Sequence, residues 1–302
     1  MVRAVERAHE IGADAIQVFA DNPTAWRRRA GPPAELPAFR CRLEELGIGP
    51  VAIHAPYLVN LGSPDDDLFG RSLAVLAHEL AVAPGYGARF VNVHIGSHRG
   101  TGVAAGIARV ADGIARLLEM APTGPGAPIL VLENTAGSGA GLGASVEELA
   151  RILEASTARG VDPAGLGICL DTAHLWGAGV DIGEPEGVDA LVDEVEARLG
   201  LARLVMVHLN DSKAALGSHA DRHQHLGAGT IGVRGLARLL THPRLRHVAY
   251  YLETPGMDEG YDALNIARAR DIAAGRPLAP LPPEALEPGR SRGRTAPAGS
   301  RA

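Results

Sequence analysis

The carboxyl ends of the predicted strands carry most of the reactive side chains of this chain. Strand-like apolar runs alternate with helix-like segments along most of the 302 residues, and the apolar runs are continuous. Continuous runs are typical of strands buried on both faces, as in a parallel sheet covered by helices. Six runs end in an imidazole or a carboxylate, at His54, His94, Glu133, Asp171, His208 and Glu253. A fold that gathers these strand ends would build one polar site.

The alternation predicts seven strands separated by helices. The strands are expected at 14–20, 51–54, 89–94, 128–133, 165–171, 204–208 and 248–253. The helices are expected at 2–12, 34–46, 66–82, 102–120, 145–157, 187–199, 233–240 and 260–273. Such an order is compatible with an α/β barrel of the TIM type or with a doubly wound open sheet. We favour the barrel, because it brings all strand ends to one mouth, whereas an open sheet spreads them along a line.

Composition limits the compartment and the class of protein. The chain is 46% hydrophobic and long enough to bury a large core. It has no apolar run of about 18 residues and no signal core at its start, so we predict no membrane contact. Its two cysteines, Cys41 and Cys169, suit a reduced, cytoplasmic protein. The net charge of -6 argues against a general nucleic-acid coat but permits a local basic face.

The last part of the chain differs in composition from the rest. From residue 274 onward it is rich in proline, glycine, arginine and alanine, with few large apolar residues to repay ordering. We therefore predict a barrel domain over residues 1–273 and a disordered basic tail over 274–302. The tail either has no role or attracts polyanions weakly.

The loop between 208 and 227 adds further candidate metal ligands. Asp221 and His223 lie two positions apart, so they point the same way in an extended backbone. Alone, this loop could be a solvated, histidine-rich connection. Together with His174 and the strand-end residues, however, it gives nine candidate ligands: five histidines, two aspartates and two glutamates. Zinc takes about four ligands, so nine residues with one bridging carboxylate would hold about three ions.

A cluster of several metal ions is suited to hydrolysis of a phosphodiester. One ion lowers the pKa of a bound water to give hydroxide, and others bind the phosphate oxygens and the leaving group. No residue nucleophile is needed in such a reaction. The sequence contains no P-loop and no Gly-x-Ser-x-Gly elbow that would indicate a different chemistry.

At these residues the chain resembles the endonuclease IV family of apurinic/apyrimidinic endonucleases, within the xylose-isomerase-like barrels. The resemblance covers residues 2–273, and the matching stretches are His54–Gly62, Asn92–His98, Leu132–Gly137, Cys169–His174, Ala178–Asp181, His208–Lys213, Asp221–His223 and Leu252–Thr254. It implies a TIM barrel with three zinc ions. It also implies cleavage of double-stranded DNA on the 5′ side of abasic sites in base excision repair, leaving a 3′-hydroxyl.

The resemblance also implies a role for each ligand. His54, His94 and Glu133 would hold one ion, and Glu133 would bridge to a second. The second ion would be completed by Asp171, His208 and Glu253, and the third would be held by His174, Asp221 and His223. Glu133 would be the catalytic residue, because it would orient the metal-activated hydroxide.

For DNA binding, the resemblance implies that Tyr57 enters the lesion, where the abasic nucleotide is flipped out. It places Asn22, Lys213 and Arg222 on the same face, and we expect a monomer. The family's inserted arginine maps to the loop 21–26, which has no arginine before Arg27. The family's first strand maps before this chain, so we expect a barrel without that strand, with two open edges and lower stability.

Two other functions remain open on the sequence alone. A single-metal sugar isomerase or epimerase of the same barrel class could use only Glu133, Asp171, His208 and Glu253. A non-catalytic relative is the second alternative, because a strand is expected to be missing. Metal content separates the three: about three zinc ions, one manganese or magnesium ion, or none.

Overall fold

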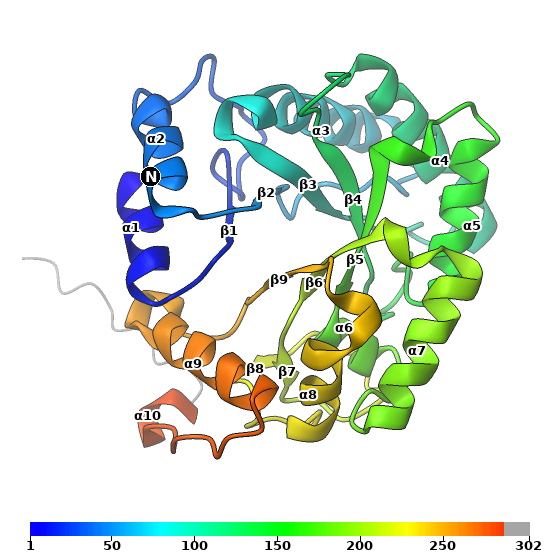
Figure 1. Ribbon diagram of the computed structural model, residues 1–302. Coiled ribbons are helices and arrows are strands. Elements are labelled where there is room, and N and C mark those ends of the chain that lie inside the picture. Colours follow the sequence, from blue (N-terminus) through cyan, green and yellow to red (C-terminus); the bar gives the residue numbers. More distant parts are fainter. Residues whose placement is uncertain (287–302) are drawn as a thin grey trace, which may run out of the picture.

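Seven parallel strands curve into a barrel wall that stays open along one side (Figure 1). The computed structural model describes residues 1–286. Around the barrel the strands follow one another in chain order: β1 (Ile16–Val18), β2 (Val51–His54), β3 (Ala88–His94), β4 (Ile129–Glu133), β5 (Leu166–Asp171), β6 (Leu204–His208) and β9 (Ala249–Tyr251). Each strand is parallel to its neighbours, and within the described residues no ladder joins β1 to β9.

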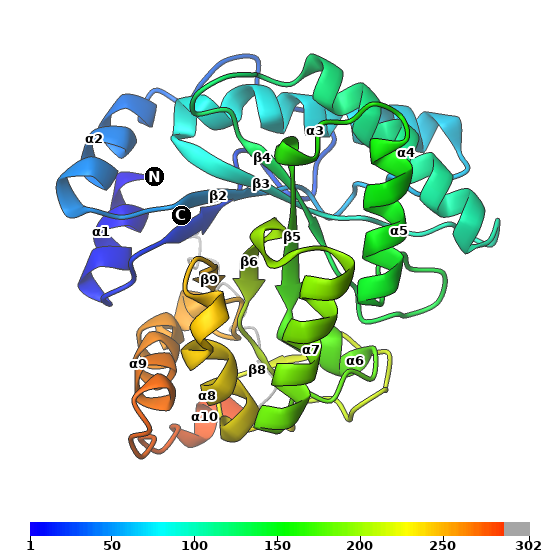
Figure 2. The same cartoon turned by 45° about the vertical axis from the view of Figure 1, so that its right-hand side comes forward.

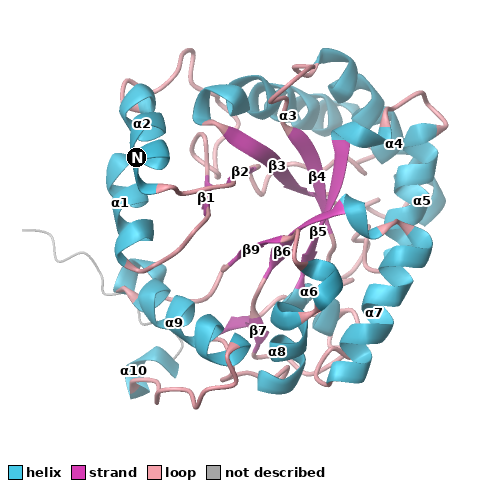
Figure 3. Cartoon of the chain, in the orientation of Figure 1, coloured by secondary structure: helices cyan, strands magenta, loops and turns pink. Residues whose placement is uncertain are grey.

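Helices cover the outside of the strands, as Figure 2 and Figure 3 show. The outer layer consists of α1 (Val2–Glu10), α2 (Leu36–Leu46), α3 (Asp66–Tyr86), α4 (Val103–Met120), α5 (Val146–Thr157), α7 (Pro185–Arg198), α8 (Val233–Thr241) and α9 (Tyr261–Ala273). The predicted TIM-type barrel is therefore confirmed, and the doubly wound open sheet is wrong. None of the helices among residues 1–286 has the length and apolar character needed to cross a membrane.

The interior of the barrel explains where the polar residues fall. One apolar cluster comes from six different strands and contains Ala52, Phe90, Val131, Cys169, Met206 and Tyr251. Successive strand residues face opposite sides, so the residue two positions further on also faces the interior. Those next positions include His54, Glu133, Asp171, His208 and Glu253. The polar site is thus the next layer above the apolar interior.

Several elements differ from the sequence prediction. The short helix α6 (Thr172–Gly177) and the antiparallel pair of β7 (Asp211–Ser212) with β8 (His223–Gln224) were not predicted. Each is too short to show a periodic pattern. Strand β9 ends at Tyr251, so Glu253 lies two residues beyond the strand and not at its last position.

The open side of the barrel is bridged by its helices. Arg7 of α1 donates two hydrogen bonds to Asp262 of α9, at 3.0 and 2.7 Å. Arg270 of α9 contacts the carbonyl of Gly12 and lies 3.4 Å from the carboxylate of Asp14. These contacts hold α1 against α9 beside the unpaired strand edges. The expected loss of stability from those edges stays a prediction.

The segment after α9 lies against the barrel up to residue 286. Leu278 packs on the main core, Arg268 donates to the carbonyl of Ala279 at 2.7 Å, and α10 (Pro283–Leu286) follows. His225 Nε2 lies 3.0 Å from the carbonyl of Ala285. The predicted disordered tail therefore does not hold for residues 274–286, because the packing of Leu278 and the two bound carbonyls of Ala279 and Ala285 fix them. The remainder of that prediction, 287–302, lies outside the described residues.

A buried ion pair fixes the loop that follows β1. Arg28 donates to Glu79 of α3 at 3.1 Å, and it also donates to the carbonyls of Asn22 and Ala25. Only 1% of the Glu79 side chain is exposed. Burial raises the pKa of Glu79 to about 7, although the charge of Arg28 opposes the shift. Glu79 therefore titrates near neutral pH in the folded chain.

Replacing Glu79 by Gln should remove this titration. The pKa of Glu79 is about 7 in the folded state. In the unfolded chain it is about 4.3, the ordinary value for glutamate. The folded state thus binds more protons in this window, and its stability falls as pH rises through it. We expect the free energy of unfolding of the wild type, relative to Glu79→Gln, to decrease between about pH 5 and pH 8. Urea denaturation measures this; a difference that rises with pH would contradict it, and exposed Glu154→Gln is the control.

Candidate metal centre

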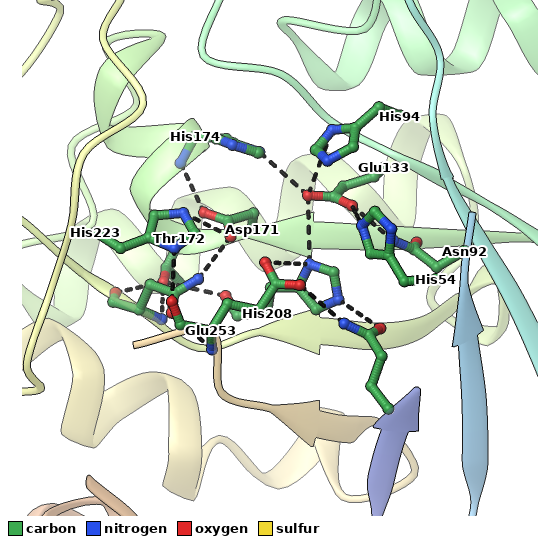
Figure 4. Close-up of polar contacts among 12 residues, drawn as sticks. His54, Asn92, His94, Glu133, Asp171, Thr172, His174, His208, His223 and Glu253 are labelled. Atoms are coloured by element: carbon green, nitrogen blue, oxygen red, sulfur yellow. Dashed lines mark hydrogen bonds and ion pairs between the residues drawn. The ribbon is translucent and has the colours of Figure 1, made fainter. Parts of the chain in front are cut away.

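All nine candidate ligands converge at the mouth of the barrel. Five of them end strands β2 to β6, namely His54, His94, Glu133, Asp171 and His208. His174 lies on α6, Asp221 and His223 come from the β7–β8 hairpin, and Glu253 follows β9. Figure 4 shows eight of these residues pointing toward one another from different strands and loops. Residues spread over two hundred positions thus face one site.

Glu133 is the centre of this arrangement, and none of its side chain is exposed. Its Oε2 atom lies 3.6 Å from His54 Nε2. Its Oε1 atom lies 3.9 Å from His94 Nδ1, and 3.3 Å from both His174 Nδ1 and His208 Nδ1. One carboxylate therefore faces four imidazoles, and its two oxygens are shared between them.

A second set of close approaches surrounds Asp221 and Asp171. The two oxygens of Asp221 lie 3.3 Å from His174 Nε2 and 3.0 Å from His223 Nε2. Asp171 Oδ2 lies 3.5 Å from His223 Nε2. Asp171 also caps α6, because its Oδ1 accepts a hydrogen bond from the backbone of His174 at 2.8 Å. His174 is thus oriented by the same aspartate that faces His223.

The spacing of these atoms fits ligands around a cation. Two atoms bound to one tetrahedral zinc ion, each about 2.1 Å from it, are about 3.4 Å apart. His208 Nδ1 lies 3.3 Å from Glu253 Oε2, and most of the distances above fall close to the same value. Within 4.8 Å, the structure groups His54, His94 and Glu133; Asp171, His174 and His223; and Glu133, Asp171, His208 and Glu253. Direct charge-assisted hydrogen bonds are shorter, at about 2.7–2.9 Å.

Unpartnered atoms give an independent indication. Glu133 Oε1, His208 Nδ1 and His223 Nε2 are buried, yet they form no hydrogen bond within residues 1–286. Buried polar atoms are normally hydrogen-bonded, and an isolated buried charge is costly. A bound cation would satisfy all three atoms, so the donor set fits divalent metal ions.

The charges of the site are mutually stabilising. Burial alone would raise the pKa of Glu133, but His94 and His208 hold it well below its ordinary range. Desolvation lowers the pKa of His223, but the charges of Asp171 and Asp221 raise it overall to about 9. The close approach of His174 and His223 lowers the pKa of Asp221. The lowered pKa values keep Glu133 and Asp221 ionised, and metal binding would release protons from imidazoles.

Buried amides hold the carboxylates in place. Asn92 donates to Glu133 Oε2 at 2.6 Å, and Asn134 Oδ1 accepts from the backbone of Asp171 at 2.7 Å. Asn210 donates to Asp171 Oδ2 at 2.7 Å and accepts from the backbone of Glu253 at 3.0 Å. Sequence reasoning missed these three residues. The available signal was their spacing, because each lies one or two positions from a ligand at a strand end.

Cys169 was also not considered as part of the site. Its thiol lies within 4.8 Å of ligand atoms of Glu133 and His208, and the residue is wholly buried. Burial raises the pKa of Cys169 to about 11, so the thiol stays protonated. Cys169 therefore belongs to the floor of the site, between the apolar interior and the ligands.

Comparison with known proteins identifies the family. Residues 5–275 match the family model described as a xylose isomerase-like TIM barrel. The chain is 42% identical over 271 residues to a probable endonuclease 4 of Methanoculleus marisnigri, covering 90% of this chain and 94% of that protein. It is 40% identical over 274 residues to a probable endonuclease 4 of Chloroflexus aurantiacus, with the same coverage. The chain belongs to the endonuclease IV family.

Solved structures agree with this family. The crystal structure of endonuclease IV from Thermus thermophilus superposes with a TM-score of 0.78 at 40% identity, covering 91% of this chain and 94% of that one. A D-tagatose 3-epimerase-like protein superposes with a TM-score of 0.67 at 16% identity, which shows a shared barrel only. The epimerase likeness is therefore one of fold.

The residues that the endonuclease IV resemblance assigns to DNA lie on exposed loops. Tyr57 is 62% exposed, and its ring lies 5.6 Å from that of His54 and 5.7 Å from that of Phe19. Lys213 and Arg222 are exposed and face each other across the β7–β8 hairpin, where their backbones pair at 2.8 Å. The remaining residue, Asn22, is exposed, and its Oδ1 atom accepts hydrogen bonds from the backbone and the hydroxyl of Thr24, at 3.0 and 2.9 Å.

Changing Asn210 to Asp should weaken metal binding. The variant keeps the shape of the side chain but loses the donor to Asp171 and adds a like charge beside it. Loss of such supporting hydrogen bonds typically costs about 10–100-fold in metal affinity. We expect a loss of that size in zinc affinity, measured by competition with a chelating dye. Asn60→Asp is the control, since Asn60 Oδ1 accepts two backbone hydrogen bonds and its amide donates to Ser97 Oγ and not to a ligand; equal losses in both variants would contradict a specific role.

Proposed function

We propose that this chain is a zinc-dependent deoxyribonuclease that cleaves the DNA backbone on the 5′ side of abasic sites and leaves a 3′-hydroxyl. As a member of the endonuclease IV family it is a DNA-cleaving hydrolase. The observation that carries the finer proposal is the convergence of nine histidine and carboxylate side chains around the buried Glu133. Such a set is larger than one ion requires.

We assign the ligands to three zinc ions. His54, His94 and Glu133 would hold the first ion, and His174, Asp221 and His223 would hold the third. The second would be held by the group that Glu133 shares with Asp171, His208 and Glu253. When bound, zinc supplies a water of lowered pKa and neutralises the charge that develops on the phosphate.

Glu133 is the proposed catalytic residue. Its Oε2 atom is occupied by the hydrogen bond from Asn92, whereas Oε1 has no hydrogen bond within the described chain. Oε1 has two lone pairs, so it could bind a cation with one and accept a hydrogen bond from the attacking water with the other. The low pKa of Glu133 keeps this carboxylate ionised, so it accepts a hydrogen bond from that water.

The proposed partner is double-stranded DNA with an abasic site, bound by a monomer. Tyr57 would stack in the space that the missing base leaves, and the exposed Lys213 and Arg222 would contact phosphates. Asn22 would contact DNA through the loop that Arg28 fixes. We expect the enzyme to act in the cytoplasm, where its unpaired cysteines remain reduced.

The alternative is a single-metal sugar isomerase or epimerase. Its four ligands are all present in the group formed by Glu133, Asp171, His208 and Glu253. That reaction has no use for the other five ligands, so the nuclease is favoured. Metal analysis of purified protein separates the two: about three zinc ions per chain support the nuclease, and a single manganese or magnesium ion supports the isomerase.

Replacing Glu133 by Gln should abolish cleavage. The variant removes the charge that faces four imidazoles and turns an acceptor into a donor. We expect no nicking of a duplex with a tetrahydrofuran abasic mimic, together with reduced zinc content, whereas exposed Glu154→Gln retains both. Cleavage by Glu133→Gln at the wild-type rate would refute the catalytic assignment.

Replacing Tyr57 by Ala should weaken lesion binding while zinc content stays the same. Stacking of an aromatic ring on a base contributes about 1–3 kcal/mol, so we expect a loss of that size in affinity for the abasic duplex. Fluorescence anisotropy of a labelled duplex measures it. Tyr57→Phe keeps the ring and should retain most of the affinity. Equal affinity of Tyr57→Ala and wild type would remove Tyr57 from the DNA-binding face.

A further inference from the structure

One side chain connects the open side of the barrel to the metal centre. Gln17 lies in the middle of the edge strand β1. Its Oε1 atom lies 3.0 Å from His208 Nε2, and its Nε2 atom donates to Glu253 Oε1 at 2.8 Å. His208 ends β6, and Glu253 follows β9, the opposite edge strand. Gln17 therefore spans the side where no ladder joins β1 to β9.

The chemistry of these contacts fixes their direction. The amide nitrogen of Gln17 can only donate, and it faces a carboxylate oxygen of Glu253, which accepts. The amide oxygen then faces His208, and His208 Nε2 must donate to it. In a neutral imidazole the lone pair then lies on His208 Nδ1, and Nδ1 lies 3.3 Å from Glu133 Oε1 and 3.3 Å from Glu253 Oε2. The other ring nitrogen therefore points at the metal centre.

We propose that Gln17 is a positioning residue of the metal centre, acting on His208 and Glu253. It selects the ring nitrogen of His208 that can bind a metal, and it orients Glu253 through its other carboxylate oxygen. Histidine ligands commonly donate their second ring nitrogen to a fixed acceptor in this way. The inference rests on the proposed metal centre and adds to it a residue that is not itself one of the nine ligands.

Gln17 also substitutes for a missing connection. Elsewhere in the barrel, neighbouring strands keep ligands such as Asp171 and His208 in register through the backbone ladder. Between β1 and β9 that constraint is absent within the described residues, so the side-chain hydrogen bonds of Gln17 provide it. We therefore expect the ion held by His208 and Glu253 to be the one most sensitive to Gln17.

Gln17→Met is the test, because methionine has a similar length and forms neither hydrogen bond. We expect about a 10–100-fold loss of affinity for one of the three zinc ions, the one held by His208 and Glu253, measured by chelator competition on the full chain. Cleavage of an abasic duplex should be restored toward the wild-type rate by excess zinc. In zinc-loaded protein labelled with ¹⁵N-histidine, the Nε2 proton of His208 should exchange with solvent faster than in wild type.

Two comparisons separate this role from a purely structural one. Arg7→Met breaks the contact between α1 and α9 on the same side of the barrel without touching a ligand. It should lower the melting temperature and leave zinc affinity unchanged. Gln17→Glu keeps the acceptor, so the His208 Nε2 proton should remain slow to exchange.

The outcomes are distinguishable. Wild-type protein with three zinc ions, together with unchanged zinc affinity in Gln17→Met, would overturn the role of Gln17 and leave the proposed function standing. Equal losses of zinc affinity in Gln17→Met and Arg7→Met would also overturn it, because the effect would then be loss of fold stability. Wild-type protein that binds no metal would overturn both proposals.

Discussion

The structure depends on keeping the carboxylate of Glu133 ionised in a site that is buried from bulk solvent. Burial of a lone carboxylate costs several kcal/mol or shifts its pKa until it is neutral. Here four imidazoles and the amide of Asn92 surround it, and its pKa is lowered instead. Those groups come from different strands and from α6, so the charge is stable only when the barrel is assembled. Formation of the fold and formation of the site are therefore coupled, because the strand order that builds the core also places the imidazoles around Glu133.

Much of this could be predicted from the sequence because strand periodicity carries it. The apolar run that ends in Glu133 places Val131 in the interior, and the same period of two places the carboxylate one layer higher. What could not be predicted depends on neighbours across the sheet. Asn92 gives no sign in the sequence that it bonds Glu133, because that contact is set by the register between β3 and β4. Gln17 was missed for the same reason, since its partners follow it by about two hundred residues.

The segment after α9 shows a second limit of composition. A stretch of sequence rich in proline and glycine indicates disorder, yet a few specific contacts are enough to fix such a stretch in place. Leu278 packs on the core, and the carbonyls of Ala279 and Ala285 are bound by Arg268 and His225. Both binding residues are buried polar groups elsewhere in the chain, so the segment also satisfies them. Composition is an average over many residues, so it cannot reveal individual hydrogen bonds such as these two.

Asp171 links coordination to helix geometry. One carboxylate oxygen starts α6 by accepting the backbone hydrogen bond of His174, while the other faces His223 and Asn210. A histidine at position 171 could also bind zinc. Its two ring nitrogens, however, are not placed like the two oxygens of a carboxylate, so it could not also accept the hydrogen bond that begins α6. Fewer amino-acid types are therefore tolerated at position 171 than metal coordination alone would permit. The helix turn, and not the ion alone, restricts which amino acids evolution can accept there.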